Sequence, residues 1–438
     1  MASSGALKLD LIYDVSRLST RTLNLTPNGI DWIDSLLADY FISGAGGPSY
    51  SLLFGFRRPR LFEPRALYNP VPRLDRAWGR DPGLSTIAVP DWLAAALRGD
   101  DSNGYKKEGP RTASNSKIRR LINVAHSLRS YAFAAGSDPS TSAPRGAAYL
   151  NASHFPLEQS RHVAWLERRP DIRPVFFIHD LLPVLRPELF WSAEPERHAR
   201  RLELLARRGA GAIVTSWLVA EQLLENLRGS GREDLPILTA TPPVVPAFRI
   251  DISKDPRLNN STYFVVCGTI EPRKNHMLLF EAWRRLVARH GRRSPKLLVV
   301  GKRGWHCDEI VTAMHDPVLR GAVVEARGLS TGAYRASLAS ACALLSPSFA
   351  EGFGLPVAEA LAAGIPTIVS DIPSHREQGG KAPLYLDPGC VDDWVDAIEA
   401  YALKASTLVE ARVRTAEHRP VEPGAYLQTV SRFLQSLT

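Results

Sequence analysis

Two glutamates frame a glycine-rich turn in the last third of the chain. The segment SPSFAEGFGLPVAEALAAGIPTIVS runs from Ser346 to Ser370, and its two acids are Glu351 and Glu359. Gly354 allows the backbone to approach a ligand closely because glycine has no Cβ atom, and a helix that begins directly after such a turn points its free N–H groups at an anion. Carboxylates accept hydrogen bonds from sugar hydroxyls. The pattern predicts a site for a phosphate-linked ligand with hydroxyls at both ends, which describes a nucleotide-sugar.

A pair of cations follows a predicted strand in the segment CGTIEPRKN, residues 267–275. Gly268 permits a tight exit from the strand Tyr263–Val266. Arg273 and Lys274 suit a diphosphate, Arg through its fork of donors and Lys as a point charge. By itself, such a pair at a helix start is also typical of a solvent-facing surface. The glutamate motif downstream favours the ligand-binding interpretation.

The segment VFFIHDL ends an apolar run with His179 and Asp180. Polar groups at the carboxyl end of a strand lie where α/β sheets bind ligands. We expect His179 to hydrogen-bond the bound sugar or to steady a departing phosphate. We expect Asp180 to orient the imidazole or to accept a proton from an acceptor hydroxyl. A histidine satisfied inside the protein at a strand end is the alternative.

Three weaker signals accompany these motifs. Asn28 and Gly29 in TPNGID are typical of a plain Asn-Gly turn, and the resemblance of this segment described below equally implies a place near the phosphate or the acceptor. Gly301 opens GKRGW after a strand, which indicates either a border of a nucleotide base or a turn with a basic tip. His154 follows another predicted strand, where core or surface placement competes with a position in the cleft.

Apolar strand-like runs alternate with helical periodicity along the whole chain, which is typical of parallel α/β layering. The predicted strands are Leu7–Val15, Ala147–Ala152, Val175–Ile178, Ala212–Thr215, Ile237–Thr239, Tyr263–Val266, Leu297–Val300, Ala343–Leu345 and Thr367–Val369. Helical spacing is clear in Asn275–His290, and shorter in Tyr334–Ala341.

The chain is long enough for two domains, which we place at residues 1–250 and 251–420. Loops are predicted at Asp100–Ser116 and Gly136–Gly146, and a proline-rich linker at Pro242–Asn260. Residues 421–438 are predicted to form a separate C-terminal helix with amphipathic spacing.

The segment EGFGLPVAE resembles the signature of retaining family 4 glycosyltransferases of the GT-B fold, and CGTIEPRKN resembles their diphosphate-binding element. The resemblance implies two Rossmann-like domains facing a central cleft, with a C-terminal helix that crosses back to the first domain. It implies that Glu351 meets the donor hexose and Glu359 the ribose, and that a histidine such as His179 contacts the donor. The implied donor-binding residues are Arg273, Lys274, Glu359, Gly354, Leu355, Gly268, Thr269, Gly301 and Phe353. Many relatives carry an arginine at the position of Thr269, so the cation geometry differs here, and Arg273 is placed to compensate.

The segments TPNGID, GTIEPRKN and HDLLP are similar to enzymes of bacterial exopolysaccharide or O-antigen assembly, many of which use GDP-mannose. The resemblance implies a hexosyltransferase acting on a saccharide acceptor, lipid-linked, at the inner face of the plasma membrane. The sequence does not separate this from a UDP-hexose-dependent enzyme or from a non-catalytic glycan-binding protein. No aspartate lies two positions from another, so we expect no Asp-x-Asp metal site and no cofactor besides the nucleotide-sugar co-substrate.

The amino-acid composition limits the classes of binding partner that we expect for this chain. A net charge of +9 and a pI near 9.5 are compatible with an anionic membrane surface, an anionic substrate or a merely solvated basic surface. No nucleic-acid-binding motif accompanies the charge, so we expect no nucleic acid partner. We expect neither a signal peptide nor a membrane span, and therefore a cytoplasmic protein. The four cysteines are far apart and predict free thiols: Cys267, Cys307, Cys342 and Cys390.

Overall fold

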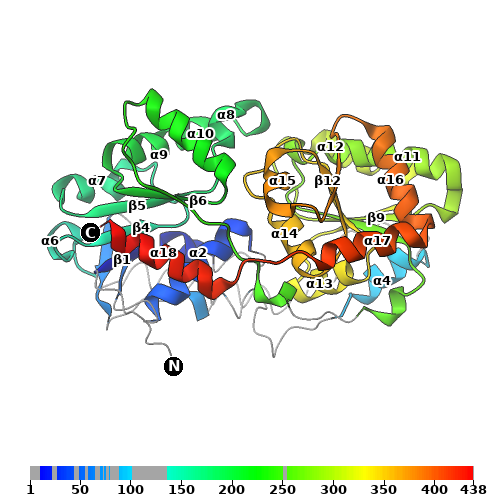
Figure 1. Ribbon diagram of the computed structural model, residues 1–438, viewed down its shortest axis with the longest axis horizontal. Helices are drawn as coiled ribbons and strands as arrows, with labels where there is room; N and C mark the ends of the chain where they lie inside the picture. Colours follow the sequence, from blue (N-terminus) through cyan, green and yellow to red (C-terminus); the bar gives the residue numbers. More distant parts are fainter. Residues whose placement is uncertain are drawn as a thin grey trace.

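Two largely parallel sheets, each covered by helices on both faces, make up the described part of the chain (Figure 1). This computed structural model describes residues 10–21, 27–43, 49–54, 58–64, 70–72, 74, 78, 88–100, 136–249 and 254–437. The start of the predicted strand Leu7–Val15 and the predicted loop after Asp100 lie outside the described residues. The alternation of strands and helices confirms the predicted α/β class.

The first sheet has seven strands in the order β3-β2-β1-β4-β5-β6-β7, and only β3 runs antiparallel to its neighbour. Its strands are β1 (Leu11–Asp14), β2 (Ser49–Phe54), β3 (Pro59–Phe62), β4 (Ala148–Asn151), β5 (Arg173–Ile178), β6 (Gly211–Val214) and β7 (Ile237–Thr239). The strand β1 lies inside the sheet, with β2 and β3 on one side of it and β4 to β7 on the other. The point where this order reverses lies between β1 and β4.

The second sheet has six strands in the order β10-β9-β8-β11-β12-β13, and all of its neighbours are parallel. Its strands are β8 (Tyr263–Cys267), β9 (Lys296–Val300), β10 (Val323–Ala326), β11 (Leu344–Ser346), β12 (Thr367–Ser370) and β13 (Leu384–Leu386). Its order reverses between β8 and β11. In open α/β sheets, ligands bind beyond the carboxyl ends of the strands at such a reversal.

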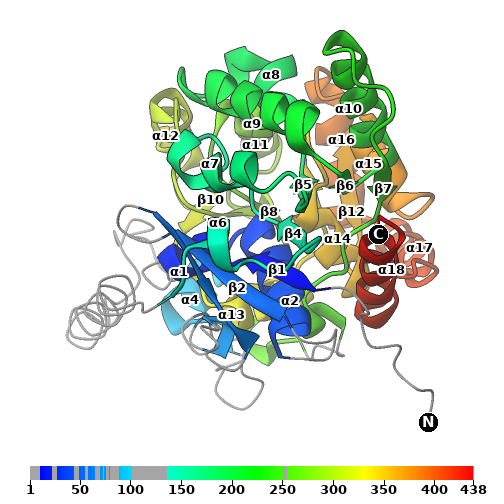
Figure 2. The same ribbon diagram turned by 90° about the vertical axis from the view of Figure 1, so that its left-hand side faces the viewer.

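Helices cover both faces of each sheet, and Figure 2 shows the first domain from its outer side. With the first sheet lie α1 (Ser16–Arg21), α2 (Gly29–Ile42), α6 (Pro139–Ser142), α7 (Ser160–Arg168), α8 (Leu182–Leu185), α9 (Glu194–Arg208) and α10 (Trp217–Gly229). With the second lie α11 (His276–His290), α12 (Asp308–Met314), α13 (Thr331–Ala339), α14 (Leu355–Ala362), α15 (Pro373–Gly379), α16 (Val391–Leu403) and α17 (Ala405–Ala416). No helix in these described ranges is both long enough and apolar enough to cross a membrane.

Successive residues of a strand point to opposite faces of the sheet, so they pack into different hydrophobic cores. In β1, Leu11 and Tyr13 pack with α2, whereas Ile12 packs on the other face with α7, α9 and α10. In β8, Phe264 packs with α11 and α16, whereas Val265 packs with α13 and α14. Strands buried on both faces read as continuous apolar runs, which is why the sequence identified them.

The last helix, α18 (Pro423–Ser436), returns to the first domain, although α17 before it packs on the second. Tyr426, Val430 and Leu434 are buried in the same core as α2 and β1. The apolar residues recur every four positions, so one face of the helix can enter that core. This return is also visible in Figure 1, where the red C-terminal helix lies along the first domain.

One helix from the first half of the chain lies in the second domain. The helix α4 (Asp91–Arg98) buries Leu93, Ala94 and Leu97 in the core of the second sheet, and Arg257 pairs with Asp91. The predicted first domain, residues 1–250, therefore has to be corrected, because residues 88–100 belong to the second. The sequence shows that a helix with one apolar face must pack against another element. Only the tertiary structure shows which sheet that element belongs to.

All four cysteines are free thiols in the structure. Cys307 is buried, and Cys267, Cys342 and Cys390 are partly buried. The prediction of free thiols is confirmed.

The position of α4 makes a prediction. Leu93 is fully buried against the second sheet, so Leu93→Ala should cost about 2–5 kcal/mol of unfolding free energy. Hydrogen exchange followed by mass spectrometry should show faster exchange in β10, which α4 covers, and unchanged exchange in β2. Leu185→Ala, at a side chain that is 45% exposed, is the control and should change neither. Faster exchange in β2 would contradict this placement of α4.

Candidate active site

A buried carboxylate with two cationic partners lies where the order of the second sheet reverses. Glu351 is 6% exposed and follows β11. Its Oε2 accepts a hydrogen bond from Arg273 Nη1 at 2.7 Å, and its Oε1 accepts from Lys274 Nζ and from Ser348 Oγ, the latter at 2.7 Å. Arg273 and Lys274 both follow β8. The structure therefore brings together the two strongest sequence motifs through a direct ion-pair network.

The charges of this network determine its protonation. Burial by itself would raise the pKa of Glu351, but the cations Lys274 and Arg273 outweigh burial and hold that pKa well below its ordinary value. Burial works against the charged form of Arg273 as well, and Glu351 and Glu271 reverse its effect, so that the pKa of Arg273 is raised. Glu351 and Arg273 are therefore both charged at neutral pH.

Glu271 is a member of this cluster that the sequence analysis missed. Its side chain is 1% exposed, and its Oε1 lies 2.5 Å from Arg273 Nε as an ion pair without good hydrogen-bond geometry. Burial raises the pKa of Glu271, and the charge of Arg273 works in the opposite direction. Arg273 is thus held from two sides by carboxylates. The sequence signal was present, since Glu271 lies two residues before Arg273 in the same motif.

Gly268 and Gly301 pack against each other at the ends of β8 and β9. A Cβ atom on Gly301 would lie 1.8 Å from the carbonyl oxygen of Gly268, and Gly268 itself has a φ of 147°. The Lys274 side chain passes over Gly268, 3.3 Å from where a Cβ would be. Thr269 packs in the same way under Gly304. The glycines therefore provide space for the lysine that reaches Glu351.

The glycine turn ends at the N-terminus of α14. Gly354 is the N-cap residue with a φ of 82°, in the left-handed region that favours glycine. His375 lies behind it: Nδ1 donates to the Ser370 carbonyl oxygen at 2.9 Å, and Nε2 lies 3.3 Å from Ser346 Oγ. Burial lowers the pKa of His375, so this side chain supports the turn as a neutral group. The sequence analysis did not identify it, because only the fold brings it under the turn.

Glu359 lies one turn further along α14. It is 9% exposed, and its charge contributes to raising the pKa of Cys267 and Tyr334, both of which are raised mainly by burial. The two glutamates of the motif thus occupy different places: Glu351 lies with the cations, and Glu359 beside the end of β8. Phe353, in the turn between them, is partly buried.

The two domains meet at this turn. A Cβ atom on Gly352 would lie 2.7 Å from Cβ of Asp180 and 3.0 Å from the carbonyl oxygen of His179, which belong to the first domain. Burial raises the pKa of Asp180, and the nearby Arg273 works against this rise. The structure therefore brings the His-Asp pair together with the glycine turn, as a shared site requires.

A second contact joins Gly29 and Leu355, where a Cβ on Gly29 would lie 3.3 Å from Leu355 Cδ2. The neighbouring Asn28 is the N-cap of α2: its Oδ1 accepts from the Asp31 N–H at 2.9 Å, and Asp31 Oδ2 accepts from the Asn28 N–H at 3.1 Å. This capping box stabilises the start of the helix. Asn28 therefore has a structural role in addition to its position at the site. Arg17, which the sequence analysis did not include, pairs with Asp31 at 2.8 Å.

His179 is buried and held by the backbone. Its Nε2 lies 2.8 Å from the Ala152 carbonyl oxygen, and its own N–H donates to His154 Nε2 at 3.3 Å. Burial lowers the pKa of His179 to about 4, so the ring is neutral at pH 7. Phe177 stacks on it, with ring centroids 4.5 Å apart.

Two further bridges between the domains flank this centre. Glu377, in α15, accepts hydrogen bonds from the backbone N–H groups of Trp217 and Leu218 at 2.6 and 3.2 Å, at the N-terminus of α10. Trp305, in the GKRGW segment, donates to the Leu189 carbonyl oxygen at 2.8 Å and stacks on Phe190. A carboxylate at a helix N-terminus is favourable because of the helix dipole. The GKRGW segment therefore contacts the first domain, which its sequence did not reveal.

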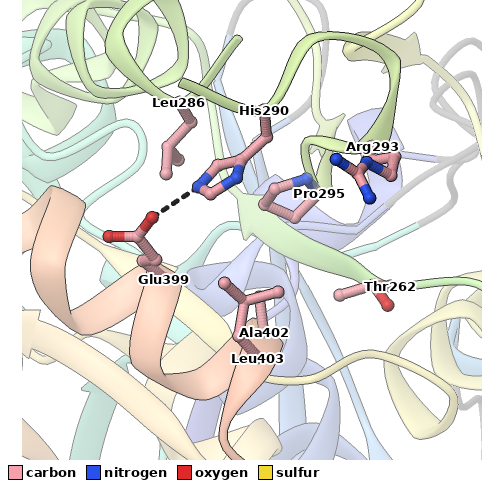
Figure 3. A pocket seen from close by; sticks show the side chains of 8 residues that line it. All are labelled: Thr262, Leu286, His290, Arg293, Pro295, Glu399, Ala402 and Leu403. Carbon is pink, nitrogen blue, oxygen red and sulfur yellow. Dashed lines mark hydrogen bonds and ion pairs between the residues drawn. The ribbon is translucent and has the colours of Figure 1, made fainter. Parts of the chain in front are cut away.

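A small pocket elsewhere in the second domain is separate from this centre (Figure 3). It is lined by Thr262, Leu286, His290, Arg293, Pro295, Glu399, Ala402 and Leu403. His290 and Glu399 face each other across it and form a hydrogen bond. Thr262 and Pro295 precede β8 and β9, so the pocket lies at the opposite end of the sheet from Glu351. Its volume of about 40 Å³ is too small for a sugar.

Comparisons with known proteins show which family model, relatives and solved structures this chain resembles. Residues 261–403 match the family model described as "Glycosyl transferases group 1". The serotype-specific mannosyltransferase WbdA of Escherichia coli is 28% identical over 249 residues, which are 52% of this chain and 29% of WbdA. The O-antigen chain mannosyltransferase B of Escherichia coli is 35% identical over 144 residues, which are 33% of this chain and 36% of that protein. The chain spans well under two thirds of the length of either relative.

The solved structure of Anabaena Alr3699/HepE in complex with UDP-glucose superposes with a TM-score of 0.59 at 12% identity, and covers 98% of this chain and 100% of that one. At this identity the likeness concerns the fold alone. The predicted GT-B fold with two Rossmann-like domains is confirmed.

The ion-pair network makes a prediction about pH. Because the pKa of Glu351 is depressed in the folded protein, its contribution to stability is complete above the ordinary value of 4.5 and is lost as the pH falls toward the folded-state value. Glu351→Gln leaves two buried cations without this carboxylate and should lower the free energy of unfolding by about 3 kcal/mol at pH 7. Urea unfolding should show this difference shrinking below about pH 4.5. A difference that grows on acidification would contradict the assignment.

Proposed function

We propose that this chain, whose residues 261–403 form a glycosyl transferases group 1 domain, is a retaining glycosyltransferase that moves a hexose from a nucleotide-sugar to a saccharide acceptor. The observation that carries the proposal is the pairing of Glu351 with Arg273 and Lys274. This pairing lies at the carboxyl ends of the central strands of one domain and faces Asp180 of the other. It places cations for a diphosphate and carboxylates for hydroxyls around one turn.

Departure of a nucleoside diphosphate builds negative charge on its oxygens. Arg273, Lys274 and the N-terminus of α14 are the groups that would stabilise this charge. Glu351 pairs with both cations, so a bound diphosphate would compete with Glu351 for them. Since the protein supplies these positive groups itself, we propose that turnover needs no metal ion.

On the sugar side, Glu351 would flank the developing positive charge and accept hydrogen bonds from the hexose hydroxyls. Glu359 would accept from the ribose. In the retaining mechanism that we propose, the acceptor hydroxyl attacks the face that the phosphate leaves, and the phosphate takes its proton. No side-chain nucleophile is assigned in this mechanism. Asp180 and His179, on the first domain, would contact the sugar from the opposite side.

The names of the relatives support the choice of mannose as the hexose, with GDP-mannose as donor. Both are described as mannosyltransferases, one of them serotype-specific and the other acting in the O-antigen chain. We therefore propose a role in bacterial surface polysaccharide synthesis, with a lipid-linked acceptor and a cytoplasmic location at the inner face of the plasma membrane. The net charge of +9 supports contact with an anionic membrane surface. A UDP-hexose is the alternative donor, and a non-catalytic glycan-binding protein is the alternative function.

A nucleotide-release assay tests the proposal. The chain is incubated with GDP-mannose and a lipid-linked oligosaccharide, and released GDP and the anomeric configuration of the product are measured. We expect release only with acceptor, retention of configuration, and an unchanged rate in EDTA. Release of UDP from a UDP-hexose in the presence of acceptor, with no release of GDP from GDP-mannose, would favour the alternative donor. Glycan binding without release from any nucleotide-sugar would overturn the enzymatic proposal.

Two alanine variants should separate diphosphate binding from turnover. Lys274→Ala removes a cation from the diphosphate site and should weaken nucleoside-diphosphate binding about 10-fold to 100-fold, because a charge-assisted contact is lost. Glu351→Ala should lower turnover about 100-fold or more while the nucleoside diphosphate binds at least as tightly, because the competing carboxylate is gone. Calorimetry and the release assay give the two quantities. An unchanged dissociation constant in Lys274→Ala, or wild-type turnover in Glu351→Ala, would contradict these roles.

A further inference from the structure

A short loop after β4 contacts both the ring and the backbone of His179. The loop comprises residues 152–159, and His154 within it is 7% exposed. Ala152 at its start provides a carbonyl oxygen to the His179 ring, and His154 provides its own ring nitrogen to the His179 N–H. On the other side of the chain, Thr215 Oγ1 donates to the His179 carbonyl oxygen at 3.1 Å. The backbone N–H and the carbonyl oxygen of His179 therefore both have hydrogen-bond partners.

These contacts determine which ring nitrogens carry protons. A carbonyl oxygen can only accept, so His179 Nε2 must carry a proton to bond to Ala152. An N–H can only donate, so His154 Nε2 must be bare to accept from His179. Burial keeps both rings neutral, with the pKa of His154 lowered well below its ordinary value and that of His179 lowered to about 4. His179 Nδ1 is consequently an unprotonated acceptor, and within the described ranges no partner for it is found.

The loop itself is anchored below the site. Asn151 Nδ2 donates to the Phe155 carbonyl oxygen and to Asp14 Oδ2, both at 3.0 Å. Asp14 also accepts from Tyr149 and His162, at 2.6 and 2.9 Å. This fully buried network fixes the two ends of the turn that carries His154.

His154 also has an unusual backbone conformation. Its φ is 65°, in the left-handed region that residues with a Cβ atom seldom adopt. Such a conformation persists where the surroundings over-determine it, and it is found most often at functional sites. Here it turns the His154 ring toward His179, with ring centroids 5.0 Å apart.

We propose that His154 is a positioning residue: it accepts from the His179 backbone N–H and so orients a ring whose tautomer the Ala152 carbonyl oxygen determines. In this orientation His179 Nδ1 accepts a hydrogen bond from a hydroxyl of the transferred sugar. The sugar part rests on the proposed function, whereas the orientation and tautomer do not. A neutral His179 with a bare Nδ1 cannot donate to the departing phosphate through that atom. Of the two roles that the sequence left open for His179, this geometry selects the contact with a hydroxyl.

Two substitutions of His154 test this role. The Oε1 atom of glutamine lies as many bonds from Cα as Nε2 of histidine does, so His154→Gln keeps an acceptor for the His179 N–H. His154→Leu removes the acceptor and keeps a side chain of similar bulk. We expect His154→Leu to lower turnover about 10-fold to 100-fold, since small displacements of a contacting group are costly, and His154→Gln to recover most of it. His290→Gln, in the remote pocket, is the matched control and should leave turnover unchanged.

Nitrogen-15 NMR of histidine-labelled protein reads the tautomer without a substrate. At pH 7, wild type and both His154 variants should show His179 protonated at Nε2 and bare at Nδ1, because the Ala152 carbonyl oxygen stays in place. The His179 ring signals of His154→Leu should differ from those of His154→Gln, because only glutamine still accepts from the His179 backbone N–H. A wild-type signal from Nδ1–H, or His179 ring signals that are the same in His154→Leu and His154→Gln, would overturn the positioning role whatever the chain catalyses.

Monodeoxy donor sugars test the hydroxyl contact. One deoxy position should slow wild type strongly, because removing that hydroxyl leaves Nδ1 unpaired, and the same deoxygenation should cost His154→Leu much less. Equal costs in both proteins would overturn the sugar contact. If the chain proves to transfer no sugar, the NMR result still decides the positioning role by itself.

Discussion

The described site depends on one interaction, the pairing of the buried Glu351 carboxylate with Lys274 and Arg273. A carboxylate at this depth is tolerated only with charged partners, and the removal of one partner leaves an uncompensated charge. Because the cations follow β8 and the acid follows β11, the pairing ties together the two loops where the sheet reverses. The same tie fixes the glycine turn and therefore the N-terminus of α14. A diphosphate bound there would compete with Glu351 for the two cations.

The second constraint is the lack of space between the domains. Gly352 meets Asp180, and Gly29 meets Leu355, at separations that a Cβ atom would violate or strain. Glu377 adds a carboxylate from the second domain to the N-terminus of α10 in the first. The residues that would act on a sugar therefore belong to both domains, and the site is complete only when these contacts are made. The candidate site and the contact between the domains are parts of one structure.

The strands and motifs that the sequence predicted share a physical property: each is local. A strand buried on both faces is a continuous apolar run, and β1, β4, β5, β6, β8, β9, β11 and β12 were recognised on that ground, as was the short apolar strand β7. The strands β2, β3, β10 and β13 were missed: β3, β10 and β13 are short strands at sheet edges, and the interior strand β2 mixes Ser and Tyr with its apolar residues. Glu271 and His375 were missed for another reason: a buried acid and a buried histidine look like any other acid and histidine until the fold surrounds them.

The sequence alone determined that this chain forms two parallel α/β layers, and that Glu351, Arg273, Lys274 and His179 lie at the carboxyl ends of strands, because residue spacing and apolar periodicity are properties of the local chain. Only the tertiary structure decided which of these groups meet. It paired Glu351 with both cations, it placed Glu359 near Cys267 at the end of β8, it placed α4 on the second domain, and it bound His179 to His154. Such contacts depend on how the sheets stack and face each other. They join residues that are far apart in the sequence, so no local sequence pattern predicts them.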